Sequence, residues 1–508
     1  MGPHRQIEAK LEAPRGAAVP DLTGLPGVAS ADPGEHDALE AVHWDTAGLR
    51  LARARITLRR RTGGPDEGWL LLVPVSADEW LDLRSPLGAE AAGVPADLVA
   101  AVAARVREAT LAPVMVLRTA RSVRRLRDAH GRVLLEVADD AVASGPPDPG
   151  GAVVDSWREW DVNLVHGDQD LLARAVKRLR ASGGTSPQWT HKLGRALGDR
   201  LVVESTGRLD DQVDQHCAGE VLREHLRSRR DLLLARDPRV RRDQPGAAHQ
   251  MRVTTHQLLF ALATFGPLMD RGATDQLRGE LGWLAGLLGA DRAARVASDR
   301  LADLIAQEPA DLVLGPIDQR LRASLSAERD ATHRRVLEAL DSARYFRLLD
   351  AIDVVVTAWR PTKAAAGPAD KALPVLVRGE WDALVTAFEA ASSALPGADR
   401  DSHLHAALSA CLRVRYAADA VAPAMGGSAD KFARAAKELQ RLLTDHDDLV
   451  EHGALLRRVA VEAAEAGENA FTYGRFHAIE QAGAAYVEKR LAAAWSKVRA
   501  PRRRRWMK

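Results

Sequence analysis

The order of hydrophobic and polar positions changes character once along the chain, near residue 210. Before that point, short segments such as ARITLRRRT and RVLLEVADD alternate apolar with polar residues, and turn sequences such as TGGPDEG separate them. A period of two is typical of strands with one buried face, so these segments predict an antiparallel sheet or barrel built from hairpins. Two stretches near residues 94–109 and 168–182 favour helices within this region.

After residue 210, apolar residues recur at helical spacing almost to the end, as in DQLRGELGWLAGLLG. Breaks that contain Pro and Gly, at 361–368 and 395–398, divide this region into two halves. We therefore predict an α+β multidomain protein. Its sheet domain with a connector covers residues 1–200, its all-α domain covers 205–498, and a basic tail that we expect to be disordered covers 499–508.

Composition narrows the cellular setting and the partners. The 71 basic and 69 acidic residues leave a formal net charge of +2, so any anion site must come from local clustering. Cys217 and Cys411 cannot form a disulfide framework and fit a reducing compartment. The start has no apolar signal core, and no apolar run approaches the length of a membrane span. We predict a cytoplasmic protein without a membrane span, and we expect no specific nucleic-acid partner.

Charged residues recur on one face of the predicted strands. Alternate residues of a strand share a face, so Arg59 and Arg61 lie on one side and Arg60 on the other. The same spacing joins Glu8 with Lys10, and Glu136 with Asp140. Glu159, Asp161 and Asn163 continue the pattern in a later segment. Because both signs recur while the opposite faces are apolar, we predict a closed or cupped sheet with a polar lumen, which suits a polyanion and a divalent metal.

Residues 1–165 resemble a CYTH domain, the triphosphate-tunnel family. The resemblance rests on QIEAKLE, HWDTAGLRLARARITLRRRTGGPDEGW, VLRTARSVRRL, LLEVADDAVA and WREWDVNL, in that order. It implies an antiparallel β tunnel that binds tripolyphosphate, thiamine triphosphate or ATP, with Mg²⁺ or Mn²⁺ as the metal. It further implies phosphate ligands at Lys10, Arg59, Arg61, Arg118 and Arg121, and metal ligands at Glu8, Glu136 and Asp161.

Several charges of that family are absent from this chain. Gln6 and Asn163 stand where the family has carboxylates, Leu72 stands where it has lysine, and Ala120 lies in a strand that is usually richer in basic residues. Loss of one preorganised transition-state donor costs about 10²–10³ in rate. The sequence therefore predicts reduced or absent catalysis and identifies no catalytic residue.

The helical region contains an internal repeat. Positions 249, 252, 256 and 259 share one helix face in HQMRVTTHQLLFAL, and 405, 408, 412 and 415 share one in HAALSACLRVRYAA. These segments, with LGADRAARV and LQRLLTDHDDLV, resemble a CHAD domain over about 215–495. The resemblance implies two four-helix bundles around a basic cleft that binds inorganic polyphosphate. The implied ligands are His249, Arg252, His256, His405, Arg413 and Arg415.

The sequence is compatible with three functions. The first is binding of polyphosphate or triphosphate with reduced or absent catalysis, in a cytoplasmic protein associated with polyphosphate granules. The second is a metal-dependent triphosphatase that acts on tripolyphosphate or on nucleoside or thiamine triphosphates. The third is a degenerate scaffold that binds protein partners. The sequence determines neither the natural anion nor the oligomeric state.

Overall fold

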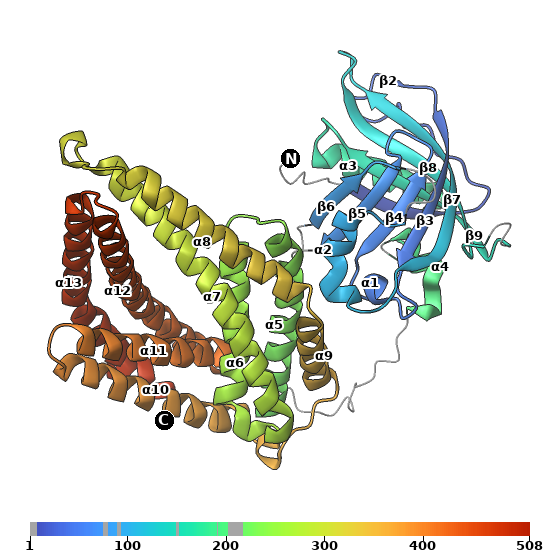
Figure 1. Cartoon of the computed structure of the whole chain (residues 1–508). Coiled ribbons are helices and arrows are strands. Elements are labelled where there is room, and N and C mark those ends of the chain that lie inside the picture. Colours follow the sequence, from blue (N-terminus) through green and yellow to red (C-terminus); the bar gives the residue numbers. More distant parts are fainter. Residues whose placement is uncertain are drawn as a thin grey trace. The chain divides into compact units, whose positions relative to one another are not determined.

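The chain forms two compact units, Met1–Thr206 and Gly207–Lys508. The computed structural model describes residues 8–74, 80–88, 93–148, 152–189, 191–201 and 217–507 (Figure 1). Gln6, one of the positions that distinguish this chain from the CYTH pattern, lies outside the described residues. The predicted fold class is confirmed, because the first unit is a nine-stranded antiparallel sheet and the second is helical.

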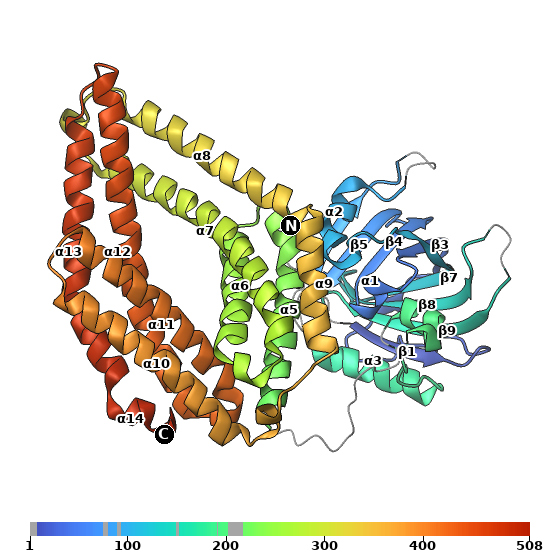
Figure 2. The same cartoon turned by 60° about the horizontal axis from the view of Figure 1, so that its bottom comes forward.

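The sheet follows the order β1-β9-β8-β7-β3-β4-β5-β6, with β2 paired to β7. Among the described residues, the edge strands β1 and β6 do not pair with each other. Figure 2 shows β3, β4 and β5 on one side and β1, β8 and β9 on the other, with β7 between them, so the sheet is cupped. The strands are β1 Glu8–Ala13, β2 Ser30–Ala31, β3 Glu35–Asp45, β4 Thr57–Thr62, β5 Gly68–Pro74, β6 Trp80–Ser85, β7 Ala112–Arg127, β8 Val133–Gly145 and β9 Asp155–Leu164.

Helices cover the outer face of the sheet and bury its apolar residues. Helix α3 (Gln169–Ala181) packs Leu179 against Leu11 and Trp160. On the other half, α1 (Arg50–Arg53) and α2 (Ala96–Val106) pack against β4 and β5, where Leu58 and Leu71 are fully buried. Because alternate side chains of a strand face opposite ways, burial of these residues directs their charged neighbours to the inner face.

The turn between β4 and β5 depends on its two glycines. Gly63 and Gly64 adopt φ values of +80° and +73°, in the left-handed region that glycine tolerates best. A Cβ atom at Gly63 would lie 2.2 Å from the carbonyl oxygen of Ala38. The Gly-Gly pair therefore sets the close return of the hairpin that carries Arg59 and Arg61.

A short helix that the sequence did not predict lies on the inner face. Helix α4 (Lys192–Leu197) follows the predicted connector and continues into η1 (Gly198–Arg200). Leu193 and Leu197 are buried there in one cluster with Ala41, Leu117 and Trp157. These contacts reach β3, β7 and β9, so α4 fills part of the cup with apolar side chains.

The helical unit divides at the predicted breaks. Helices α5 to α9 precede the break at 361–368, and the break at 395–398 separates α10 from α11. Among the described residues, the second half has the four long helices α10 to α13. The first half has the four helices α5 to α8 and a fifth helix, α9. The helices are α5 Ala218–Arg241, α6 Ala247–Thr264, α7 Arg271–Gln307, α8 Ile317–Leu340, α9 Ala343–Thr357, α10 Ala369–Ser393, α11 Ala398–Met425, α12 Gly427–Glu465 and α13 Phe471–Arg499. Short 3₁₀ turns are η2 Gly266–Leu268, η3 Ala310–Leu312 and η4 Lys363–Ala366.

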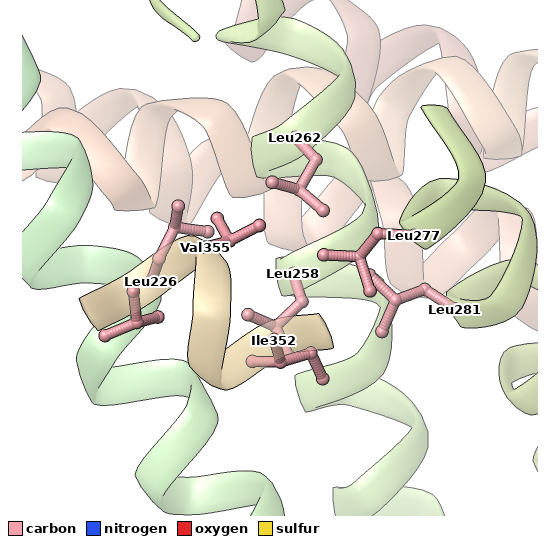
Figure 3. Close-up of a pocket in the computed structure, with 8 residues that line it drawn as sticks. Leu226, Leu258, Leu262, Leu277, Leu281, Ile352 and Val355 are labelled. Atoms are coloured by element: carbon pink, nitrogen blue, oxygen red, sulfur yellow. The ribbon is translucent and has the colours of Figure 1, made fainter. Parts of the chain in front are cut away.

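The core of the first half contains one small void. Its volume is about 10 Å³, and it lies among α5, α6, α7 and α9 (Figure 3). Every lining residue is aliphatic, so the void has no polar group that could hold an ordered water. It is a packing defect and has no features of a ligand site. The lining residues are Leu226, Leu258, Leu262, Leu277, Leu281, Ile352, Val355 and Val356.

The expectation of a disordered basic tail is wrong. The described part of the tail forms α14 (Pro501–Arg504) and η5 (Arg505–Met507). Trp506 contacts the ring of Phe432 at 6.1 Å, and the Arg504 guanidinium lies 4.6 Å from the ring centre of Trp381. Two apolar anchors, Trp506 and the buried Met507, therefore hold a segment whose arginines suggested a solvated end.

A helix that crosses a membrane must be both long and predominantly apolar. Within residues 8–74, 80–88, 93–148, 152–189, 191–201 and 217–507, no helix is both long and apolar enough to cross a membrane.

Candidate functional site

Arg59 lies on the inner face of the sheet. Its strand neighbours are His43 on β3 and Leu70 on β5. Arg59 makes no hydrogen bond or ion pair with any described residue, and its Nε is buried. Burial, reinforced by Arg61, lowers the pKa of Arg59 to about 10. Among the described residues this arginine is a buried cation without a paired carboxylate, which is the property expected of a site for an anion.

The surroundings of Arg59 reinforce its positive potential. Arg61 is buried and forms an ion pair of 3.0 Å with Asp66 in the hairpin turn. Burial, together with Arg59, lowers the pKa of His43 to about 3, so that imidazole is neutral at physiological pH. A pocket of about 200 Å³ borders Arg59, Asp66 and Arg84. Leu72 stands where the CYTH pattern has a lysine. It lies on the same strand face as Leu70, and its paired positions on the neighbouring strands are Thr57 and Asp82.

Three carboxylates meet on β8 and β9. Ligand oxygens of Asp140, Glu159 and Asp161 lie within 4.8 Å of one another, so this group could hold a metal ion. The ammonium group of Lys192, from α4, lies 2.9 Å from Asp140 and 3.2 Å from Asp161, and it also contacts Glu159. Arg121 donates two hydrogen bonds to Asp140, at 2.8 and 2.7 Å. Two protein cations therefore already balance two of the three negative charges of this acidic triad.

The pKa shifts follow from this arrangement. Burial opposes the charge on Lys192, but the carboxylates of Asp161, Asp140 and Glu159 outweigh burial and raise the pKa of the amine. Burial likewise opposes the charge on Asp140, yet the hydrogen bonds from Arg121 and the charge of Lys192 lower the pKa of that carboxyl. Both groups are thus held in their charged forms.

The three predicted metal ligands occupy different surroundings. Glu8 pairs with Lys10 at 3.1 Å, and Glu136 pairs with Arg125 at 2.9 Å. Asp161 belongs to the acidic triad. The strand register aligns Glu8 and Glu136 with Asn163, whose buried amide oxygen has no hydrogen-bond partner among the described residues. In the described part of the chain, Asp161 is therefore the only predicted metal ligand that lies in a cluster able to hold a metal ion, whereas Glu8 and Glu136 do not.

Arg118 and Arg121 lie on opposite faces of β7. Arg121 faces the acidic triad, whereas Arg118 pairs with Glu40 at 2.8 Å and is about half exposed. Residues three apart on a strand point to opposite faces, so the spacing of Arg118 and Arg121 already predicted that they could not bind one ligand together. Lys192, Arg84 and Arg195 were missed, because no motif marks a residue that reaches the sheet from a short helix or from an edge strand. Arg195 forms an ion pair with Glu12 at 2.8 Å.

In the helical unit, arginines without carboxylate partners gather on α5 and α6. Arg252 makes no hydrogen bond or ion pair with any described residue, and its Nε is buried. Arg229 donates to the side-chain oxygen of Gln257 at 3.2 Å, and Arg236 donates to the carbonyl of Gln250 at 2.6 Å. Burial lowers the pKa of all three arginines. We call Arg229, Arg236 and Arg252 the unpaired arginine cluster.

The two predicted histidines of α6 lie beside this cluster. Burial, with Arg252 and His249 adding to it, lowers the pKa of His256 to about 4. Burial and the neighbouring arginines, Arg252 first among them, also lower the pKa of His249. The ring of His256 packs on Phe260 at 5.3 Å. Both rings therefore lie in a positive, partly desolvated environment.

The second repeat differs because its charges are partnered. His405 pairs with Asp447 at 2.8 Å, and Arg413 pairs with Glu380 at 3.0 Å. Arg415 contacts Gln440, lies 3.6 Å from Asp419 and covers the ring of Tyr416 at 4.9 Å. Helices α6 and α11 meet where Phe260 stacks on Tyr416 at 6.2 Å. Of the three predicted residues in α11, Arg415 is next to the aromatic contact with α6, while His405 and Arg413 face carboxylates on α12 and α10.

The first unit is a cupped antiparallel sheet, and the second is a helical domain in two halves. This is the domain order that the sequence predicted. Residues 224–457 match the CHAD domain family. The chain is 35% identical over 515 residues to the uncharacterized proteins MT2285 and Rv2226 from two strains of Mycobacterium tuberculosis, and the match covers 97% of this chain and 96% of each relative. The chain therefore belongs to the same family as these two proteins, and the CHAD part of the predicted organisation is confirmed.

Two solved structures are also similar. PptA from Streptomyces chartreusis matches with a TM-score of 0.46 at 23% identity, over 55% of this chain and 99% of that protein. The CHAD domain from the plant Ricinus communis matches with a TM-score of 0.41 at 22% identity, over 58% of this chain and 98% of that domain.

Proposed function

We propose that this protein binds linear phosphate polymers, with inorganic polyphosphate at the helical unit and triphosphate at the sheet. The observation that carries the proposal is the unpaired arginine cluster. Burying a cation without a counter-ion is unfavourable, and within the described part of the chain these three guanidinium groups have only neutral hydrogen-bond partners or none. A polyanion would supply the missing negative charge at several points, and its binding would release counterions. Counterion release is known from nucleic acids and applies to any linear polyanion.

The sheet supports binding of a short anion in the same way. Arg59 has no ion-pair partner among the described residues, and Arg61 and Arg84 share the carboxylate of Asp66. The predicted ligands Lys10 and Arg121 already pair with carboxylates, so they would have to exchange partners when phosphate binds. Arg59 is thus the residue of this set that is best prepared for an anion.

Reduced or absent catalysis is part of the proposal. The oxygens of Asp140, Glu159 and Asp161 are the donors that Mg²⁺ and Mn²⁺ prefer. Lys192 and Arg121, however, hold these oxygens in ion pairs, and a divalent ion would have to displace the ammonium group. The triad as arranged does not fit a resident metal, and we derive no hydrolytic step through one.

The alternative is a metal-dependent triphosphatase, which the acidic triad favours as a group of possible metal ligands. Release of phosphate from tripolyphosphate, ATP and thiamine triphosphate, with and without Mg²⁺ or Mn²⁺, separates the two functions. Binding without turnover is expected. Efficient metal-dependent release by the natural chain would establish the alternative.

Polyphosphate binding is tested by calorimetric titration of the full chain with long-chain polyphosphate. Arg252→Ala is expected to weaken binding roughly tenfold or more, because a hydrogen bond to a charged group contributes about 1.5–3 kcal/mol. The matched control is Arg320→Ala, which removes an arginine held by Glu468 at 2.6 Å. Equal loss in both variants, or no loss in either, would reject the helical site.

A further inference from the structure

Outside these anion sites, one buried histidine faces two carboxylates in the second half of the helical unit. His446 of α12 is only 2% exposed. Its Nε2 lies 3.6 Å from Oδ1 of Asp401 on α11 and 3.4 Å from Oε1 of Glu488 on α13. Three helices, labelled in Figure 1, thus contribute one potential ligand each.

The histidine nitrogen is unsatisfied, which distinguishes this group from an ordinary acidic cluster. Nε2 of His446 is buried and has no hydrogen-bond partner among the described residues, although both carboxylate oxygens lie close to it. A buried polar atom without a partner is costly, and a bound ion is one way to satisfy it. The nitrogen and the two carboxylate oxygens lie within 4.8 Å of one another, close enough for the three atoms to share one ion.

Arg400 orients one of the carboxylates. Its guanidinium group donates to Oε2 of Glu488 at 3.2 Å, and it is itself fixed by the carbonyl of Ala394 at 2.6 Å. The other oxygen of Glu488 is the one that faces His446. A hydrogen bond to the outer oxygen of a ligating carboxylate is a common second contact in metal sites.

We propose that Asp401, His446 and Glu488 form a binding site for a divalent transition metal, with Zn²⁺ the best fit. Tetrahedral zinc with bonds of about 2.0–2.2 Å has ligand-to-ligand edges of about 3.3–3.6 Å. The two measured nitrogen-to-oxygen distances, 3.4 and 3.6 Å, fall in that range. Octahedral Mg²⁺ with bonds of about 2.1 Å would need edges of about 3.0 Å and oxygen donors, so this site disfavours it.

The site leaves one position for water or another ligand. The side chains of Asp401 and Glu488 are 30% and 28% exposed, so the site opens to solvent on the carboxylate side. A bound metal would join α11, α12 and α13, and binding to the folded state alone would stabilise this half of the unit. This proposal does not depend on polyphosphate binding, because its residues lie outside the unpaired arginine cluster.

The test uses the full chain, stripped with a chelator and then titrated with Zn²⁺ alone. One Zn²⁺ per chain is expected, with a rise in unfolding temperature that the chelator reverses. Co²⁺ in place of Zn²⁺ should give the visible absorption of a four-coordinate nitrogen and oxygen site. Mg²⁺ should produce neither effect at comparable concentration.

Asp401→Asn and Glu488→Gln are expected to abolish stoichiometric Zn²⁺ binding and the chelator-sensitive stabilisation. The control is His403→Gln, which removes an exposed histidine two residues from Asp401 and should leave both intact. The proposal fails if the natural chain binds no Zn²⁺, in which case His446 acts only as an ion-pair partner. It also fails if Asp401→Asn and Glu488→Gln fold and take up Zn²⁺ as the natural chain does, because the metal then lies elsewhere.

Discussion

The ammonium group of Lys192 lies 2.9 Å from the carboxylate of Asp140, in the position that a divalent cation would need in order to reach the acidic triad. The lysine comes from a helix of six residues, whereas the carboxylates come from adjacent strands. The first unit thus carries a tethered monovalent cation beside Asp161, one of the three metal ligands that the sequence predicted. This relationship links the fold of α4 to the expected loss of chemistry.

Replacing Lys192 by methionine is expected to open the triad to metal. Loss of one partner of a buried ion pair costs about 3–5 kcal/mol, so the unfolding temperature of Lys192→Met should fall in metal-free buffer. Mn²⁺ should then stabilise Lys192→Met more than it stabilises the natural chain, because, of the two described cations, only Arg121 would remain to balance the three carboxylates. Thermal unfolding with and without Mn²⁺ measures both effects. Arg195→Met is the control, since that arginine lies on the same helix but pairs with Glu12. An identical Mn²⁺ response in all three proteins would contradict the prediction.

Arg59→Ala should weaken tripolyphosphate binding without destabilising the anion-free protein. The substitution removes an unpaired cation whose pKa burial has lowered, so folding loses no ion pair. Affinity should fall about tenfold to a hundredfold, from the loss of about 1.5–3 kcal/mol of charged hydrogen bonding. Calorimetry gives the affinity, and thermal unfolding gives the stability. Arg60→Ala, one residue away on the opposite strand face, is expected to leave the affinity unchanged. Equal losses in the two variants would mean that charge, and not the inner face, governs binding.

Polyphosphate affinity should rise on acidification, and His256 should contribute to that rise. The pKa of His256 is about 4 before an anion binds. A polyanion favours the charged form and raises the pKa of the imidazole, so each binding event takes up protons between the two values. The increase should therefore be small above pH 7 and steeper between pH 6.5 and 5. His256→Arg should bind more tightly at pH 7.5 and should show a shallower slope. Parallel curves, or weaker binding by His256→Arg, would place His256 outside the anion site.

Stability of the helical unit should fall as the pH is lowered below about 6.5. Burial lowers the pKa of His225 to about 3 and that of His256 to about 4, whereas unfolded histidine titrates near 6.5. Below pH 6.5 the unfolded chain binds protons that the native state excludes, so unfolding becomes favourable, and this effect levels off only near pH 3–4. Unfolding temperature measured from pH 7.5 to 5 should decline, and His225→Gln should reduce the decline. A flat profile for the natural chain would show that these rings are solvated and titrate normally.

The periodicity of the sequence predicted most of the fold. Strand alternation placed Arg59 and Arg61 on the inner face, and the helical spacing with its two breaks gave the division of the second unit. The same alternation should have separated Arg118 from Arg121. Lys192 could not be predicted, because its contact with Asp140 depends on how a short helix enters the sheet. The proposed metal ligands at 401, 446 and 488 likewise share no motif, since only the packing of three helices brings them together.

The unequal pairing of charge in the two helical repeats has a consequence for tolerance to mutation. In α6, Arg252 has no hydrogen-bond or ion-pair partner within the described residues, so substitutions of Arg252 should spare expression and reduce ligand binding. In α11, Arg413 is held by Glu380 and His405 by Asp447, so substitutions there leave a carboxylate unpaired and should reduce the yield of folded protein. A deep mutational scan could measure the abundance and the polyphosphate binding of each variant separately. Substitutions in the α6 copy of the motif should mainly reduce polyphosphate binding, whereas substitutions in the α11 copy should mainly reduce abundance.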